Sequence, residues 1–285
     1  MPARVAVVTD STAYLPPALA ARAGVTVVPL QVVVAGRSLA EGVEVTSEEI
    51  AHELREWRPV TTSRPSPLLF VETYRSLLDA GASGIVSVHL SGDLSGTVDA
   101  ARTAARALGP EGARVRVVDS RLLAMGLGFA ALAAARAAEA GVDVDEIARR
   151  TARQALATGV WLYVDTLEYL RRGGRIGHAS AWVGSALAVK PLLHLVDGRV
   201  EPLERVRTTS RAIARLEEIT VAEAGTAPVD VAVQHLAAGE RAADLAERLR
   251  ARIPGLRELV VDEVGAVVGA HAGPGMLGVV VAPAG

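Results

Sequence analysis

Short runs of β-branched residues alternate with alanine-rich segments of helical length through the first half of the chain. This alternation constrains the fold most, because repeated strand–helix–strand units place their strands in one mostly parallel sheet with helices on its faces. The expected strands are 5–8, 25–30, 85–88, 115–118 and 160–164, and the expected helices are 16–23, 47–57, 67–80, 97–108, 123–140 and 144–157. The pattern predicts an α/β fold for this half.

The pattern changes after about residue 157. The turn Asp197-Gly198 lies between two alternating stretches and predicts a two-stranded hairpin. Helices are expected at 210–223 and 240–253, and strands at 229–233, 259–261, 267–268 and 277–281. This order predicts a separate α+β domain. The expected division is an N-terminal α/β domain, residues 1–156, and a C-terminal α+β domain, residues 157–285.

Charge and composition exclude several classes of function. Thirty basic residues stand against 32 acidic ones, so the net charge of −2 gives no electrostatic footprint for nucleic acid or an anionic membrane surface. Without cysteine the chain forms no disulfide, zinc–thiolate site or thiol nucleophile, which fits a cytoplasmic protein. Glycines and prolines interrupt the uncharged run 264–285, so we expect no stable membrane insertion.

Standard catalytic and cofactor signatures are missing from the sequence. It holds no P-loop, dinucleotide-binding fingerprint, nucleophile elbow or zinc-protease helix. Its six histidines are scattered without the spacing of metal ligands. We therefore expect neither a metal nor a cofactor.

The first unusual segment, 61–67, combines four hydroxyl residues and two prolines with Arg64 and leads into an expected helix. One interpretation is a stiff loop rich in hydrogen-bond donors, and the other is a helix cap. Ser66 and Pro67 suit the cap and the first helical position, but a cap leaves the preceding hydroxyls unused.

Two further segments place polar groups among glycines. Residues 89–97 follow a strand and open a helix, so backbone N–H groups there can approach an anion, although a plain strand-to-helix turn explains the same pattern. Residues 269–276 place His271 in an expected turn of Gly, Ala and Pro, where it is either a structural hydrogen-bonding group or part of a site.

A basic helix end follows at Arg171, Arg172 and Arg175. Arginines near a helix C-terminus complement the helix dipole. Because three arginines exceed what one helix end needs, we also consider a docking surface for an acidic partner.

Taken together, six motifs resemble the DegV family in order and spacing over nearly the whole chain. They are Val8-Thr9-Asp10-Ser11-Thr12-Ala13, Thr62-Ser63-Arg64-Pro65-Ser66-Pro67, Ser91-Gly92-Asp93-Leu94-Ser95-Gly96-Thr97, Gly173-Gly174-Arg175-Ile176, Lys190-Pro191 and His271-Ala272-Gly273-Pro274-Gly275. The resemblance implies a bacterial fatty-acid-binding protein of two α/β domains that enclose a long-chain fatty acid between them. Some members present the acid to a separate fatty acid kinase, which phosphorylates its carboxylate.

The resemblance also implies a set of site residues. The family's carboxylate-binding hydroxyls fall on Thr62 and Ser95, and the family histidine near the head group is similar to His271. The expected neighbours of the head group are Ser63, Arg64, Ser91 and Gly96.

This sequence departs from the family pattern at four positions. Arg64 stands where glutamine is common, Gly92 where serine is common, Val98 where tyrosine is frequent, and Ala272 where threonine is common. These changes leave both carboxylate-binding hydroxyls in place.

The physical requirements of a fatty acid site agree with these residues. A buried carboxylate needs hydrogen-bond donors, and the acyl chain needs a long apolar cavity. The small-residue stretches 125–135 and 179–188 either leave room for such a chain or pack closely against neighbouring elements.

Two other classes of function stay open. In a serine hydrolase of acyl esters or acyl phosphates, Ser95, His271 and Asp10 would form the nucleophilic triad. A purely structural or regulatory interaction protein would need none of the hydroxyl clusters. We expect a binding protein that performs no chemistry itself.

Overall fold

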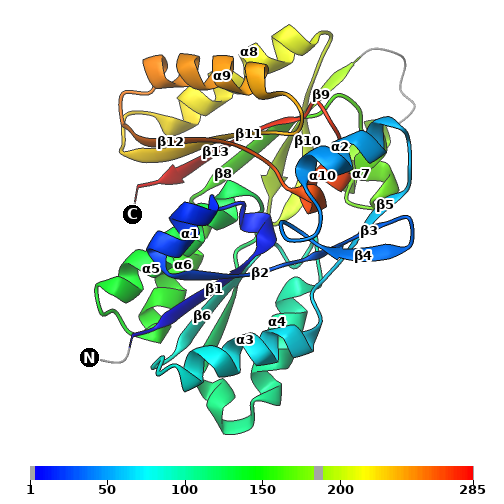
Figure 1. Ribbon diagram of the computed structural model, residues 1–285. Helices are drawn as coiled ribbons and strands as arrows, with labels where there is room; N and C mark the ends of the chain where they lie inside the picture. The colour runs from blue at the N-terminus through cyan, green and yellow to red at the C-terminus, as the bar shows by residue number, and fades with distance from the viewer. Residues whose placement is uncertain (1–3, 183–188, 285) are drawn as a thin grey trace. The chain divides into compact units, whose positions relative to one another are not determined.

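The computed structural model describes residues 4–182 and 189–284, and these form two compact units (Figure 1). Unit 1 contains the chain up to Gln31 together with Ser63–Leu156, and unit 2 contains Val32–Thr62 and Ala157–Ala284. The chain therefore passes between the units at residues 31/32, 62/63 and 156/157. Residues 32–62, which lie within the expected N-terminal domain, group with the C-terminal residues.

Unit 1 is built on a four-stranded sheet in the order β2-β1-β6-β7, and all three strand pairs are parallel. The strands are β1 (Ala6–Asp10), β2 (Val25–Val28), β6 (Ile85–His89) and β7 (Val115–Asp119). Helices α3 (Pro67–Asp79) and α4 (Thr97–Ala107) cover one face of the sheet, and α1 (Pro17–Ala23), α5 (Met125–Glu139) and α6 (Val144–Leu156) lie on the other (Figure 1). The predicted parallel α/β fold is confirmed.

Small residues let the helices of unit 1 approach the sheet closely. Ala100, Ala101 and Ala104 of α4 are buried in one cluster with Phe70 and Tyr74 of α3. On the opposite face, a Cβ atom at Gly128 of α5 would lie 2.7 Å from the carbonyl oxygen of Ala13. The stretch 125–135 is therefore a close-packed interface, while residues 183–188 of the stretch 179–188 lie outside the described residues.

Unit 2 contains a mixed six-stranded sheet in the order β10-β9-β8-β13-β11-β12. Its strands are β8 (Gly159–Tyr163), β9 (Lys190–Val196), β10 (Arg199–Val206), β11 (Val229–His235), β12 (Leu256–Glu263) and β13 (Leu277–Pro283). Only the pair of β11 and β12 is parallel among the pairs of this sheet in the described residues. The expected hairpin forms between β9 and β10, with positive φ values of 50° at Asp197 and 81° at Gly198.

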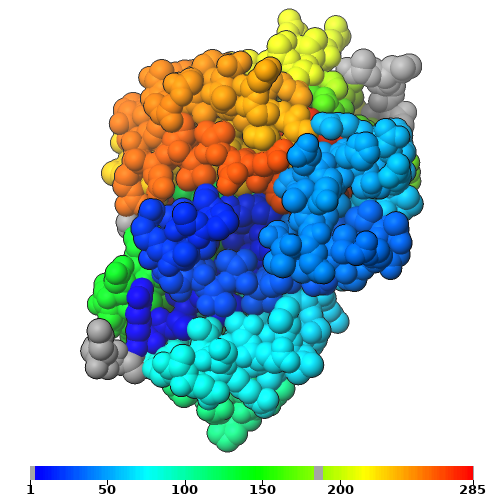
Figure 2. Space-filling view, viewed as in Figure 1, coloured from blue at the N-terminus to red at the C-terminus, as the bar shows by residue number. Residues whose placement is uncertain are grey.

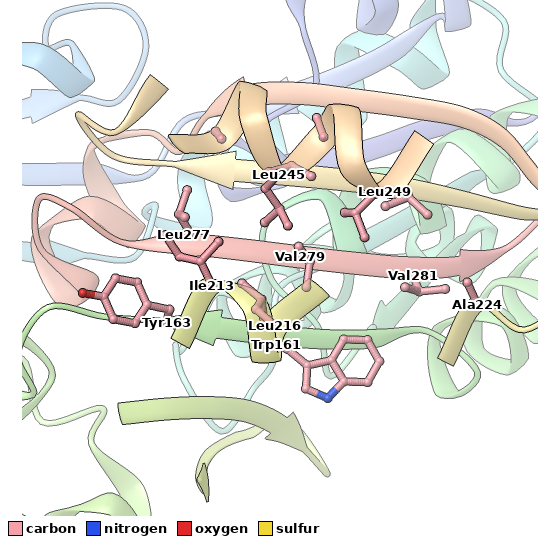
Figure 3. Close-up of a cluster of buried hydrophobic side chains, with 14 of the residues drawn as sticks. Trp161, Tyr163, Ile213, Leu216, Ala224, Leu245, Leu249, Leu277, Val279 and Val281 are labelled. Carbon is pink, nitrogen blue, oxygen red and sulfur yellow. The ribbon is translucent and has the colours of Figure 1, made fainter. Parts of the chain in front are cut away.

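Helices α8 (Thr209–Ala224) and α9 (Gly239–Arg252) bury their apolar sides on this sheet. Figure 3 shows Leu245 and Leu249 of α9 above Val279 of β13, with Leu216 of α8 in the same cluster. The other side of α9 is at the surface (Figure 2), where most of its charged residues are exposed. The predicted α+β organisation of the C-terminal region is confirmed.

Three short strands were not expected from the sequence. Strands β3 (Gln31–Val34), β4 (Arg37–Ala40) and β5 (Val60–Ser63) form a sheet in the order β4-β3-β5, and α2 (Ser47–Arg55) lies between β4 and β5 along the chain. The interpretation of residues 61–67 as a loop was therefore wrong at its start. Residues 61–63 belong to β5, while Ser66 caps α3 as expected by accepting the Leu69 N–H at 3.3 Å.

The expected strand at 267–268 was also wrong, because these residues begin the helix α10 (Ala266–Ala272). The buried carboxylate of Glu41 accepts the Val267 N–H at 2.6 Å and so satisfies a free donor at the start of this helix. His271 consequently lies on a helix, and the expected turn begins after it at Gly273.

The remaining elements are short. They are α7 (Glu168–Arg172) and the 3-10 helices η1 (Ser11–Ala13), η2 (Gly109–Arg114) and η3 (Gly177–Trp182). Within residues 4–182 and 189–284, no helix has both the length and the apolar character needed to cross a membrane.

Candidate functional site

In unit 2 the structure joins two of the predicted site residues. The Oγ1 atom of Thr62, on β5, lies 2.9 Å from Nε2 of His271, on α10. Gly173 makes room for the imidazole ring, since a Cβ atom there would lie 1.9 Å from Nδ1 of His271. The glycine that follows the basic helix end is therefore needed for the position of His271.

The protonation of His271 determines what Thr62 can offer a ligand. Burial, and after it the charge of Arg175, lowers the pKa of His271 to about 4, so the ring is neutral at pH 7. Its Nδ1 atom is buried and has no hydrogen-bond partner in the described part of the chain. Among the described residues Nδ1 is unpaired in either tautomer, and because an unpaired buried N–H is rarer in folded proteins than an unpaired buried acceptor, we assign the proton of the neutral ring to Nε2. His271 then donates to Thr62, and the Thr62 hydroxyl proton is free to donate elsewhere.

Ser95 lies in unit 1, in the turn between β6 and α4. The N–H groups of Leu94 and Ser95 donate to the carbonyl oxygen of Ser91, at 3.0 and 3.1 Å. The Ser95 hydroxyl lies 2.9 Å from that of Thr97, the first residue of α4. Gly96 provides no side chain to cap this helix, so the positive end of its dipole faces the turn uncapped. The arrangement favours an anionic ligand.

Arg64 brings a positive charge to the same turn. A Cβ atom at Gly96 would lie 2.6 Å from Nη1 and 2.9 Å from Cδ of Arg64, so the arginine lies directly over this glycine. Arg64 is exposed and forms no ion pair with the described residues. Arg64, at a position where the resemblance implies glutamine, therefore places an unneutralised charge beside Ser95.

The other expected head-group neighbours differ in what they can offer. Ser91 is fully buried and serves the turn, because its hydroxyl accepts the Asp93 N–H at 3.2 Å and its N–H donates to Leu122. Ser63 is exposed at the end of β5. The space at position 92 favours glycine, since a Cβ atom there would lie 2.8 Å from Oδ2 of Asp119.

The hydrolase triad considered above lacks its acid. Both oxygens of Asp10 are occupied within unit 1, Oδ1 by Thr12 and Oδ2 by His89 and Leu90. No carboxylate pairs with Nδ1 of His271 in the described residues. Asp10 therefore pairs with His89, a contact that no sequence pattern predicted.

The basic helix end is partly neutralised. Glu168 accepts hydrogen bonds from Arg171 and, at 2.8 Å, from Arg172, and these bonds lower the pKa of Glu168 to about 2. The Arg172 guanidinium also lies 4.8 Å from the ring centre of Trp57. Arg175 donates to the Gly173 carbonyl at 2.5 Å. The spacing of Glu168 three and four residues before the arginines was a readable signal for this pairing.

Lys190, the lysine of the Lys190-Pro191 motif, is a second feature that the sequence analysis did not assign. Its Nζ lies 2.8 Å from Oδ1 of Asp165, which also accepts the Tyr163 hydroxyl. A Cβ atom at Gly275 would lie 2.1 Å from Oδ2 of Asp165, so this pair supports the turn that follows α10. In the described ranges, no three acidic or histidine side chains gather closely enough to hold a metal ion.

Comparison with known proteins identifies the family of this chain. A family model described as "Uncharacterised protein, DegV family" matches residues 4–284. The chain belongs to the DegV family. A DegV domain-containing protein of Streptomyces coelicolor is 61% identical over 281 residues, which are 99% of each chain. The predicted family is thus confirmed.

Two solved DegV structures share the fold. One, described as showing fatty acid binding of a DegV family protein from Thermus thermophilus, superposes with a TM-score of 0.93 at 36% identity over 99% of this chain and 100% of that one. The other, DegV of Bacillus subtilis, described as a fatty acid binding protein, gives a TM-score of 0.88 at 32% identity with the same coverage.

Proposed function

We propose that this chain binds a long-chain fatty acid and that the hydroxyls of Thr62 and Ser95 donate to its carboxylate. The observation that carries the proposal is the 2.9 Å contact between Thr62 Oγ1 and His271 Nε2, and with the ring proton assigned to Nε2 the threonine keeps its own proton for a ligand. His271 orients this donor and is fixed in turn by the close approach to Gly173. The fatty acid binding described for the relatives of Thermus thermophilus and Bacillus subtilis supports the same ligand class.

The donors suit a carboxylate that is removed from water. Each hydrogen bond to a charged acceptor contributes about 1.5–3 kcal/mol, so two hydroxyls offset part of the cost of burying the head group. The uncapped start of α4 and the unpaired Arg64 add favourable potential at Ser95. An uncharged lipid gains little from these last two features, so the site favours acids over alcohols.

In this proposal the protein is a cytoplasmic carrier without a catalytic step of its own. A separate fatty acid kinase would transfer a phosphoryl group to the carboxylate of the bound acid. The surface of Arg171, Arg172 and Arg175 would receive an acidic face of that kinase. Glu168 offsets one of the three charges, so the surface stays positive.

Lipid extraction from the natively purified protein tests the proposal. Mass spectrometry of the extract should find a long-chain fatty acid, and the double variant Thr62→Val with Ser95→Ala should retain much less of it. Added fatty acid should also bind saturably to delipidated wild-type protein. The proposal fails if a lipid-replete preparation carries no fatty acid and the delipidated protein binds none.

A further inference from the structure

Unit 1 contains a fully buried chain of four hydrogen-bonded side chains, which we call the buried relay: Tyr74, Ser87, His89 and Asp10. Tyr74 Oη lies 2.7 Å from Ser87 Oγ, and Ser87 Oγ lies 2.7 Å from His89 Nε2. His89 Nδ1 lies 3.0 Å from Asp10 Oδ2. All four residues have an exposed fraction of 0%. Buried polar groups of this kind specify one local geometry when every member is satisfied.

One arrangement of protons satisfies the whole relay. Burial raises the pKa of Tyr74, so its hydroxyl keeps its proton and donates to Ser87. Ser87 then donates to Nε2 of His89, and Nδ1–H of His89 donates to Asp10. The ring of Phe70 meets the His89 ring edge-on, with centroids 5.0 Å apart, and holds its plane. The order of the atoms is that of a hydrolase triad, but the buried serine cannot meet a substrate.

The relay ends on the backbone of the turn that carries Ser95. Oδ2 of Asp10 also accepts the N–H of Leu90, at 3.0 Å, and Leu90 is the first residue after β6. Oδ1 accepts the N–H and the hydroxyl of Thr12, at 3.1 and 2.5 Å. One carboxylate therefore joins the chain after β1 to the chain after β6, at the carboxyl edge of the parallel sheet.

We infer that Asp10 and His89 are positioning residues for the Ser95 donor. They touch no ligand themselves. They fix the first residue of the turn 90–96 and, through it, the direction of the Ser95 hydroxyl. This inference rests on the proposed function, since it assigns Ser95 to the carboxylate. Loss of the relay should therefore loosen the turn and weaken the binding of fatty acids more than the binding of alcohols.

A matched pair of substitutions at His89 tests the inference. The amide nitrogen of His89→Asn can replace Nδ1–H as the donor to Asp10, whereas His89→Leu removes both ring nitrogens. Hydrogen exchange of the amides in 90–96 should be about tenfold faster in His89→Leu and nearly unchanged in His89→Asn. The preference for a fatty acid over the matching alcohol should fall about threefold to tenfold in His89→Leu alone.

Tyr74→Phe is the control for the loss of a buried hydrogen bond alone. It removes the far end of the relay and keeps the hydrogen bond from the Leu90 N–H to Asp10. It should lower the Tm without changing the acid preference. If His89→Leu does not fold, Asp10→Asn takes its place with the same expected shifts. The inference is overturned if exchange and preference stay as in wild type, or if Tyr74→Phe shifts them equally. If wild type binds no fatty acid, the proposed function fails, while the exchange measurement still tests the relay.

Discussion

His89 of unit 1 and His271 of unit 2 differ in how many of their ring nitrogens are hydrogen-bonded. His89 of unit 1 is fully buried, and both of its ring nitrogens have partners within the protein. His271 of unit 2 has one partner, Thr62, and its Nδ1 atom has none in the described residues. A histidine with both nitrogens bonded fixes the scaffold. His271 is only half-satisfied, and the proposed function assigns the hydroxyl proton of its partner Thr62 to a bound carboxylate.

The largest expected effect is the contribution of His271 to the pH dependence of stability. His271 has a lowered pKa in the folded state, so the unfolded state binds its proton first as the pH falls. The contribution of His271 to the free energy of unfolding should decline by about 3 kcal/mol as the pH falls from 6.5 to 4. Urea unfolding of wild type and His271→Gln over this range should show a steeper loss for wild type. Parallel curves would contradict the assigned burial.

The next largest effect concerns the two hydroxyls. Thr62→Val or Ser95→Ala removes one donor without filling the space of the acyl chain. Each substitution should lower the affinity for fatty acids about tenfold to a hundredfold and the affinity for the matching alcohols much less. A competition titration measures both ligands. Equal losses for acid and alcohol would mean that these hydroxyls support the fold and not the carboxylate.

A smaller effect is expected at Arg64, which is exposed to solvent. Arg64→Gln should weaken acid binding about threefold at low salt and hardly at all at high salt, because screening already reduces the charge. Arg64→Lys keeps the charge, so its affinity for the acid at low salt should lie between those of wild type and Arg64→Gln. A loss that does not depend on salt would assign Arg64 to packing on Gly96.

The smallest effect is expected at the basic helix end. Charge reversal at Arg172 and Arg175 should slow kinase-dependent phosphorylation of the bound acid about twofold to fivefold and change its salt dependence. Charge reversal at Arg172 alone should leave fatty acid binding the same and serves as the control, because Arg175 also donates to the Gly173 carbonyl beside His271. An unchanged rate with unchanged salt dependence would remove the docking surface from the proposal.

The sequence predicted the elements that have long and regular patterns. The parallel strands of unit 1, its helices and the hairpin at Asp197 all follow from apolar periodicity and turn chemistry. Strands β3, β4 and β5 were missed because each has only four residues and is largely half-buried or exposed, so its alternation is weak. Val267 and Val268 favour a strand locally. They begin a helix instead, and its first turn is capped by Glu41, which lies 226 residues before Val267 in the sequence.

The residues of the proposed site come from the resemblance to the DegV family and not from local periodicity. Motifs in the sequence point to Thr62, Ser95 and His271, yet their partners come from distant segments. The contact between Asp10 and His89 spans 79 residues, and no local pattern announces it. The fit of His271 against Gly173 likewise depends on the packing of α10 beside α7.

The tautomers of His89 and His271 can be read together from one nitrogen NMR spectrum of protein labelled at histidine. At pH 7 the geometry predicts opposite states, with the proton of His89 on Nδ1 and the proton of His271 on Nε2. Substituting each histidine in turn assigns the signals. A proton on Nδ1 of His271 would contradict the proposed site, because Thr62 would then donate to the ring and keep no proton for a carboxylate.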